Sequence, residues 1–344
     1  MTAPDPLTDL RLPEGFLVRP PDERDVSDVV ALLAATRSPT AKPVDVEGVT
    51  ANLVGLGSWT RRQLVVHDAA GRLQAWVAVH DRAAGRTNLE LVVAPSPTED
   101  DLAGALLDWV AATAAGLARQ RGQAQTVLDT TPSAGDDRQQ AWLAAAGYQH
   151  VRDWLHMLLP VAPADEQAPA AVPKRPGVVV RRVREHGSGL PVAVDVQIVH
   201  QLLEESFADH FNSYRESFSE FVQRLREDPW HRWDHWWIAT VATDGLVQPG
   251  GVLISSVSPP DRQGRYGTYI DYIGVHRRSR GRGVAKALLA TVVADTAARG
   301  RHWVGLEVDA ASPTGADGLY RSLGWEVESL TRSWHREVPA AAGD

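Results

Sequence analysis

Apolar residues along this chain recur at two spacings, one typical of strands and one typical of helices, and they do so in the same order twice. In the first half these spacings predict a strand (16–19), a helix (26–34), a hairpin of two strands (63–67 and 73–79), a further strand (89–93) and a long helix (102–117). In the second half they predict a strand (178–183), two helical segments (196–211 and 218–225), three strands (236–241, 251–257 and 269–275), a helix ending near Ala298 and a last strand (303–308). The repeated order predicts two α/β halves, each a mixed, mostly antiparallel twisted sheet flanked by helices.

Residues 161–177 separate the two halves. This stretch is rich in Pro and Ala and has no apolar periodicity, so it predicts a semi-extended connector. We therefore expect a first domain at 1–160, a linker at 161–177, a second domain at 178–338 and a short tail at 339–344. The halves also share a register, because Val93 lies as far before Leu106 as Val275 lies before Leu288.

A glycine-rich basic turn joins the strand at 269–275 to the helix that follows it. The turn reads Arg280-Gly281-Arg282-Gly283-Val284-Ala285. The first N–H groups of a helix have no internal partner, the helix dipole is positive there, and glycines let a ligand approach the backbone closely. The pattern predicts a pyrophosphate-binding turn, and the alternative is a solvated basic loop.

This turn resembles the acyl-CoA-binding signature of the GNAT superfamily of N-acetyltransferases, with Arg280, Gly283 and Ala285 at its characteristic positions. A second GNAT signature is similar to the segment 303–325, in which Tyr320 occupies the tyrosine position, Trp325 replaces a Phe, and Ser312 stands where many members have Asn. The resemblance covers residues 177–338. It implies that acetyl-CoA is the co-substrate and that Arg280, Gly281, Arg282, Gly283, Val284, Ala285 and Ser312 contact it.

The first half carries acidic residues where the second half carries this turn. In the shared register, Thr98-Glu99-Asp100-Asp101 aligns with Arg280-Gly281-Arg282-Gly283, and Leu143 aligns with Tyr320. Acidic side chains suit the start of a helix but repel a pyrophosphate. We expect a degenerate, non-catalytic GNAT-like first half, with an unrelated α/β half as the alternative. The layout resembles tandem two-domain GNAT acetyltransferases of the mycothiol synthase type.

The resemblance also implies a catalytic arrangement. In the family, one strand splays away from its neighbour and its amides hold the cofactor arm, which here points to Ile273 and to Val275 as donor to the thioester oxygen. It implies Tyr320 as the acid that protonates the leaving thiolate, with a packing role as the alternative. Asp271 is the candidate base, with a structural carboxylate, a substrate anchor or an ordered water as alternatives.

For the acceptor amine, the sequence offers a cluster of acidic and aromatic residues after the first strand of the second half. Glu205 and His210 are the candidates there, and Tyr269 is a third on the cofactor strand; a solvated helix face is the alternative. His231 and His235 are four residues apart, but no third ligand accompanies them, so we expect no metal site.

Composition narrows the function classes further. A net charge of −8 disfavours a nucleic-acid partner. No run approaches the ~20 apolar residues of a membrane span, and Met1–Pro6 lacks the order of a signal peptide. We therefore expect a cytoplasmic monomer or homodimer that acetylates a small-molecule primary amine. Because the chain has no Cys to carry an acetyl group, we expect direct transfer in a ternary complex. A non-catalytic CoA-binding or interaction module, and an enzyme that uses a longer acyl-CoA, remain as alternatives.

Overall fold

The computed structural model describes residues 10–38, 41–82, 85–167, 177–208, 216–243, 245–312 and 315–341. In the first half the strands are β1 (Leu17–Arg19), β2 (Arg61–His67), β3 (Leu73–Asp81), β4 (Arg86–Val93), β5 (Gln125–Thr130) and β6 (Gln149–Pro160). Its helices are α1 (Val26–Thr36), α2 (Val46–Leu53), α3 (Glu99–Gln120) and α4 (Asp137–Ala145), with short 3-10 turns η1 (Glu23–Asp25), η2 (Leu56–Thr60) and η3 (Pro163–Gln167). The predicted elements are present, and α2, α4, β5 and β6 are additional to them.

The second half repeats this order. Its strands are β7 (Val178–Arg182), β8 (His231–Thr243), β9 (Leu246–Ser258), β10 (Gly267–Val275), β11 (Trp303–Asp309) and β12 (Glu326–Pro339). Its helices are α6 (Ala193–Phe207), α7 (Phe218–Glu227), α8 (Val284–Ala298) and α9 (Ala316–Ser322), with η4 (Arg277–Ser279) after β10. The predicted α/β class, with mixed sheets flanked by helices, is confirmed.

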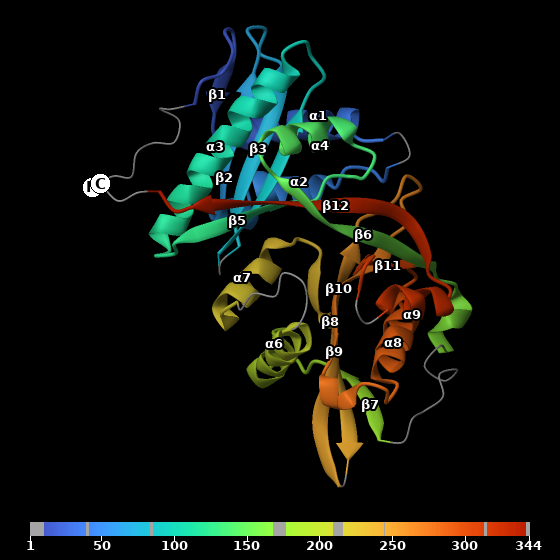
Figure 1. Cartoon of the computed structure of the whole chain (residues 1–344). Helices are drawn as coiled ribbons and strands as arrows, with labels where there is room; N and C mark the ends of the chain where they lie inside the picture. Colours follow the sequence, from blue (N-terminus) through green and yellow to red (C-terminus); the bar gives the residue numbers. More distant parts are fainter. Residues whose placement is uncertain are drawn as a thin grey trace.

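The two sheets join into one. Among the described residues the strands form a single twelve-stranded sheet in the order β1-β2-β3-β4-β5-β12-β6-β11-β10-β9-β8-β7. The last strand of each half therefore pairs with the other half: β6 pairs with β11, and β12 lies between β5 and β6 (Figure 1). The expected division at 1–160 and 178–338 describes chain order, but it does not describe two separate sheets.

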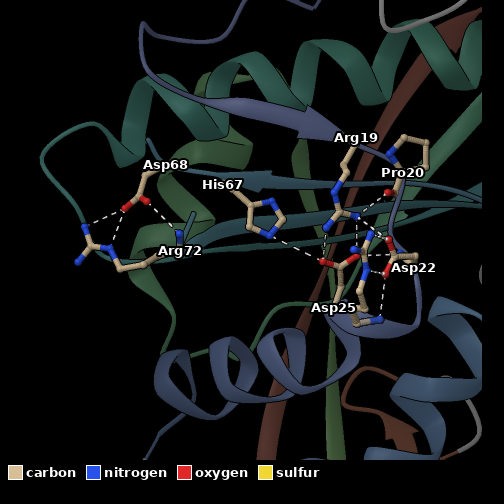
Figure 2. Close-up of polar contacts among 8 residues, drawn as sticks. Arg19, Pro20, Asp22, Asp25, His67, Asp68 and Arg72 are labelled. Atoms are coloured by element: carbon tan, nitrogen blue, oxygen red, sulfur yellow. Dashed lines mark hydrogen bonds and ion pairs between the residues drawn. The ribbon is translucent and has the colours of Figure 1, made fainter. Parts of the chain in front are cut away.

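Each half ties its first strand to its first helix through a buried aspartate. In the first half Arg19 makes two hydrogen bonds to Asp25, at 2.7 and 2.6 Å, beside the start of α1 (Figure 2). In the second half Arg181 and Arg184 both bind Asp195 in the first turn of α6. Burial raises the pKa of Asp195, but the hydrogen bonds from both arginines outweigh it and hold that pKa well below its usual value. The same arginine–aspartate contact in both halves supports an internal repeat.

The long helix α3 is apolar enough, by its length and composition, to cross a membrane. It is the one such helix in the part of the chain that the structure describes. Its buried residues, among them Leu102, Leu106 and Val110, pack in the core of the first half. Because 56% of its apolar window is buried, the helix covers the sheet as a core helix does.

A buried ion pair joins the two halves. Glu227, at the end of α7, accepts hydrogen bonds from Thr60 (2.9 Å) and Arg61 (3.1 Å) and lies 3.2 Å from His80 Nε2. Burial lowers the pKa of His80 to about 4, so this ring is neutral at pH 7 and the charges in balance are those of Arg61 and Glu227. Both side chains are under a tenth exposed. The contact therefore holds the halves in a fixed orientation.

Replacing Glu227 by Ala should destabilise the whole chain. The substitution leaves the Arg61 guanidinium buried without its carboxylate, which typically costs about 3–5 kcal/mol. Urea denaturation should therefore give a correspondingly lower free energy of unfolding. The control is Arg72→Ala, which removes an exposed ion pair with Asp68 and should cost less than about 1 kcal/mol. Equal small losses in the two variants would contradict the structural role of Glu227.

Candidate functional site

The site lies where β10 and β11 separate. The two strands are parallel, and their ladder holds only three residue pairs, the last of which is Ile270–Leu306. Beyond that pair β10 stays paired with β9, with an irregularity in register between Ile270 and Tyr272. The predicted splay of the cofactor strand is therefore present, and Asp271 occupies the irregular position.

The splay leaves two amides of β10 facing the gap. The amide of His276 donates to Gly250 O on the β9 side, at 3.0 Å. Because successive residues of a strand direct their amides to opposite edges, the amides of Val275 and Ile273 point toward β11, where the ladder has ended. These are the donors that the sequence analysis named.

The glycine turn adds a second set of amides. Gly281 and Gly283 have φ of 72° and 79°, in the left-handed region that favours glycine. The first hydrogen bond into α8 runs from Ala287 N to Gly283 O, at 3.0 Å. The amides of Val284, Ala285 and Lys286 precede that bond and have no helical acceptor. The turn therefore has the donors of an anion cradle.

One cavity of about 1490 Å³ brings these parts together. Twelve of the fourteen predicted site residues line it: Glu205, Tyr269, Asp271, Ile273, Val275, Arg280, Gly281, Gly283, Val284, Ala285, Ser312 and Tyr320. Arg282 does not line it, and His210 lies outside the described residues. The Glu205 carboxylate lies 3.1 Å from His276 Nε2 and accepts a hydrogen bond from Gln201.

The two candidate catalytic side chains differ in their surroundings. Tyr320 is 7% exposed and packs on Trp325, and burial raises its pKa to about 12. The pKa of Asp271 is raised to about 8, chiefly by burial and then by the charge of Asp228, against the hydrogen bond from Ser256 Oγ at 3.2 Å. The phenol stays protonated at neutral pH, and the carboxyl titrates near neutrality.

Some residues of the cavity were not anticipated from the sequence. Glu307 of β11 lines it, and burial raises the pKa of this carboxyl above its usual value. Arg86, Asp129 and Trp154 line it from the first half. Strand alternation places Glu307 on the sheet face opposite Val308, but nothing local to the sequence places first-half residues beside it.

The equivalent splay of the first half is filled. The β4–β5 ladder also ends after three pairs, yet Gln139 donates to Leu91 O and Arg138 to Val93 O, both at 3.2 Å. Arg138 in turn donates two hydrogen bonds to Glu99, the residue that aligns with Gly281 of the second half. These α4 side chains satisfy the strand edge that the second half leaves open.

The second half carries small residues at the positions of Arg138 and Gln139, whose side chains plug the splay of the first half. Counted back from the aligned pair Leu143 and Tyr320, Arg138 and Gln139 correspond to Gly315 and Ala316. The first half likewise has Leu143 at the tyrosine position, fully buried. A comparison of the two halves at these positions was the available signal for a single open site.

Residues 200–325 match the model of the Acetyltransferase (GNAT) family. The second half of this chain is a GNAT acetyltransferase domain. The match covers the splayed strand, the glycine turn and Tyr320, which are the parts that form the cavity. The match concerns the second half of the chain. No curated protein sequence matches it.

Solved structures extend the likeness to both halves. A GCN5-related N-acetyltransferase from Sphaerobacter thermophilus is 24% identical, with a TM-score of 0.69 over 97% of this chain and 99% of that one. A tandem GNAT protein from the clavulanic acid biosynthesis pathway is 16% identical, with a TM-score of 0.63 over 96% and 100%. At these identities the likeness concerns the fold. Among the described residues, no group of three His, Asp or Glu side chains is placed to hold a metal ion.

Because one splay is open and the other filled, isothermal titration should give one acetyl-CoA site per chain. In Gly283→Glu a negative charge is added at the N-cap of α8, next to the amides of the cradle, and binding should be lost. The matched control is Gly264→Glu in the β9–β10 hairpin, where φ is 75° and no atom crowds the new side chain. Both substitutions carry a similar left-handed strain of about 1–2 kcal/mol, so only the cradle distinguishes them. Two sites in the parent chain, or equal affinity in Gly283→Glu, would contradict this assignment.

Proposed function

We propose that this protein transfers the acetyl group of acetyl-CoA to the primary amine of a small molecule, directly and within a ternary complex. The observation that carries the proposal is the single cavity that the glycine turn, the open edge of β10, Tyr320 and Asp271 all line. Its volume of about 1490 Å³ exceeds the ~300–1,000 Å³ usual for a pocket that holds one small ligand. This supports the binding of two substrates at once.

The donors at the α8 end of the cavity fit an acyl-CoA. The amides of Val284, Ala285 and Lys286 suit the pyrophosphate, with Arg280 adding positive charge. The inward-facing amides of Ile273 and Val275 suit the pantetheine arm and the thioester oxygen, where an N–H donor stabilises developing negative charge. Acetyl-CoA, when bound, supplies the activated carbonyl carbon that the amine attacks.

Tyr320 and Asp271 divide the proton transfers. With its pKa raised to about 12, Tyr320 keeps its proton until a thiolate forms beside it and then donates. With a pKa near 8, the carboxylate of Asp271 is matched to taking a proton from an ammonium group. The chain has no Cys, so a transfer through an acetylated thiol is excluded.

The first half supports a small acceptor. Arg86, Asp129 and Trp154 of the first half line the cavity together with the second-half residues, and the buried pair Arg61–Glu227 holds the two halves together. An acceptor amine must therefore reach a cavity lined by both halves. A small, flexible molecule meets that requirement better than a folded protein does.

Tyr320→Phe should lower turnover by roughly tenfold or more, since a positioned acid commonly contributes that much. Phe keeps the packing on Trp325, so the affinity for acetyl-CoA should change little. Turnover is followed by thiol release, and affinity by titration. The control is Tyr266→Phe on the exposed hairpin, where both quantities should stay at parent values. Unchanged turnover in Tyr320→Phe would remove this residue as the acid.

The turnover number should rise with pH and level off above about 8, because the active form of Asp271 is the carboxylate and its pKa is about 8. Measured with both substrates saturating, the acidic limb should disappear in Asp271→Asn together with most of the activity. Asp261→Asn, at an exposed hairpin turn, should keep the parent profile. A limb that survives in Asp271→Asn would assign it to another group.

A further inference from the structure

The proposed reaction releases one proton in every turnover. An ammonium acceptor and a thioester give an amide, a free thiol and one proton. If Asp271 takes that proton, as the proposed function requires, it must lose it again before the next cycle. Its Oδ2 atom is buried, so the route of this second transfer is a question that the structure must answer.

Asp271 lines two cavities. One is the large cavity of the proposed reaction. The other is a chamber of about 230 Å³ that shares Asp271, Tyr269, Tyr272 and Arg224 with it and is also lined by Leu225, Asp228 and His231. At ~30 Å³ for each water in the liquid, the chamber has room for several. Asp228 and His231 line this chamber and not the large cavity.

A break in the β8–β9 ladder places His231 in this chamber. The register runs from the pair His231–Ser256 to Trp236–Ile254, so that extra β8 residues bulge between the pairs. Ser256 is the residue whose hydroxyl donates to Oδ1 of Asp271. The ring of His231 packs edge-on against Trp233, with centroids 4.5 Å apart. The bulge thus leaves His231 paired with Ser256, which is the hydrogen-bond partner of Asp271.

Two buried polar atoms of the chamber have no hydrogen-bond partner within the described chain: Nε2 of His231 and Oδ2 of Asp271. Burial, with the charges of Arg232 and His235, lowers the pKa of His231 to about 4, so its ring is neutral and able to accept a proton only briefly. Unpaired buried polar atoms are costly and are commonly satisfied by ordered water. Water between them would meet both needs.

Of the other charged groups of the chamber, Arg224 is held by hydrogen bonds and Asp228 is partly exposed to solvent. Arg224 is held by Glu216 and by the hydroxyl of Tyr272, at 2.8 Å for its shortest contact to each. Asp228 accepts from the amide of Trp230 at 2.8 Å, and burial, with the charge of Asp45, raises its pKa. Asp228 and His231 are both partly exposed, and Arg232 beside them is exposed.

We propose that this chamber holds a water chain that carries the proton from Asp271 to Asp228 and His231 and from there to solvent, while both substrates fill the main cavity. In each cycle the amine N–H bond breaks and an O–H bond forms on Asp271. That proton then moves through water to the Asp228 carboxylate or to His231 Nε2, and solvent takes it. Asp228 and His231 act through Asp271 and do not touch the acceptor.

The test uses the full chain with Asp228→Asn combined with His231→Phe. Asn keeps an acceptor for the Trp230 amide, and Phe keeps the ring packing on Trp233. Saturated turnover should fall about tenfold or more with the acceptor KM unchanged, and it should recover as the concentration of imidazole buffer rises, because a soluble base replaces the relay. Arg226→Gln, an exposed change on α7, should behave as the parent and show no dependence on buffer.

Asp228→Asn alone gives an independent readout. Removing the charge that helps to raise the pKa of Asp271 should move the acidic limb of turnover to lower pH. Parent turnover at every buffer concentration in the double variant would overturn the relay. A higher acceptor KM with unchanged turnover would overturn it also, since the chamber would then hold part of the acceptor. If Asp271→Asn itself keeps full activity, the proposed function fails at its base, and the relay fails with it.

Discussion

The parallel ladder between β10 and β11 ends at Ile270–Leu306, and the chemistry of the second half depends on that early end. A paired strand satisfies its amides along both edges. Here the amides of Ile273 and Val275 lose their partner strand just where β10 approaches the glycine turn. Backbone donors and a helix start therefore face the same cavity without any change in side-chain chemistry. The splay converts part of a structural sheet into a binding surface.

The same fold without the opening is visible in the first half. There the splay between β4 and β5 is filled by Arg138 and Gln139, and Glu99 holds Arg138 in place. Filling satisfies carbonyl groups that would otherwise need water, and it leaves no path for a cofactor arm. The first half nevertheless contributes lining residues to the cavity of the second half. Arg86 and Asp129 line the shared cavity, and the exchanged strands β6 and β12 fix where these residues lie.

Burial also determines how the candidate base can exchange its proton. Burying Asp271 raises its pKa toward neutrality, which suits a base for an ammonium group but makes the return of the proton to water harder. In the proposed relay, the chamber that Asp271 shares with Asp228 and His231 provides the route for that return. The candidate acid and base differ because burial raises the pKa of Tyr320, whereas both burial and the charge of Asp228 raise the pKa of Asp271.

Local features of this chain were readable from the amino-acid sequence alone. The glycine turn, Tyr320 and Asp271 sit at fixed offsets from a strand or a helix, and a strand's own period settles which edge an amide or side chain faces. The acidic residues from Glu99 to Asp101 likewise indicated that the first half lacks the glycine turn of the second half. His210 stays a prediction, because it lies outside the described residues, and Glu205 stays one because its carboxylate is engaged by His276.

Tertiary structure decided the rest, because strand partners are chosen by long-range packing and not by local periodicity. Neither β6 nor β12 carries a signal that it belongs beside the other half. The plug by Arg138 depends on where α4 lies over the sheet, and the chamber that Asp271 lines depends on a register break in another hairpin. The sequence determined the parts of the candidate site, and the joined sheet determined which residues of the other half lie around them.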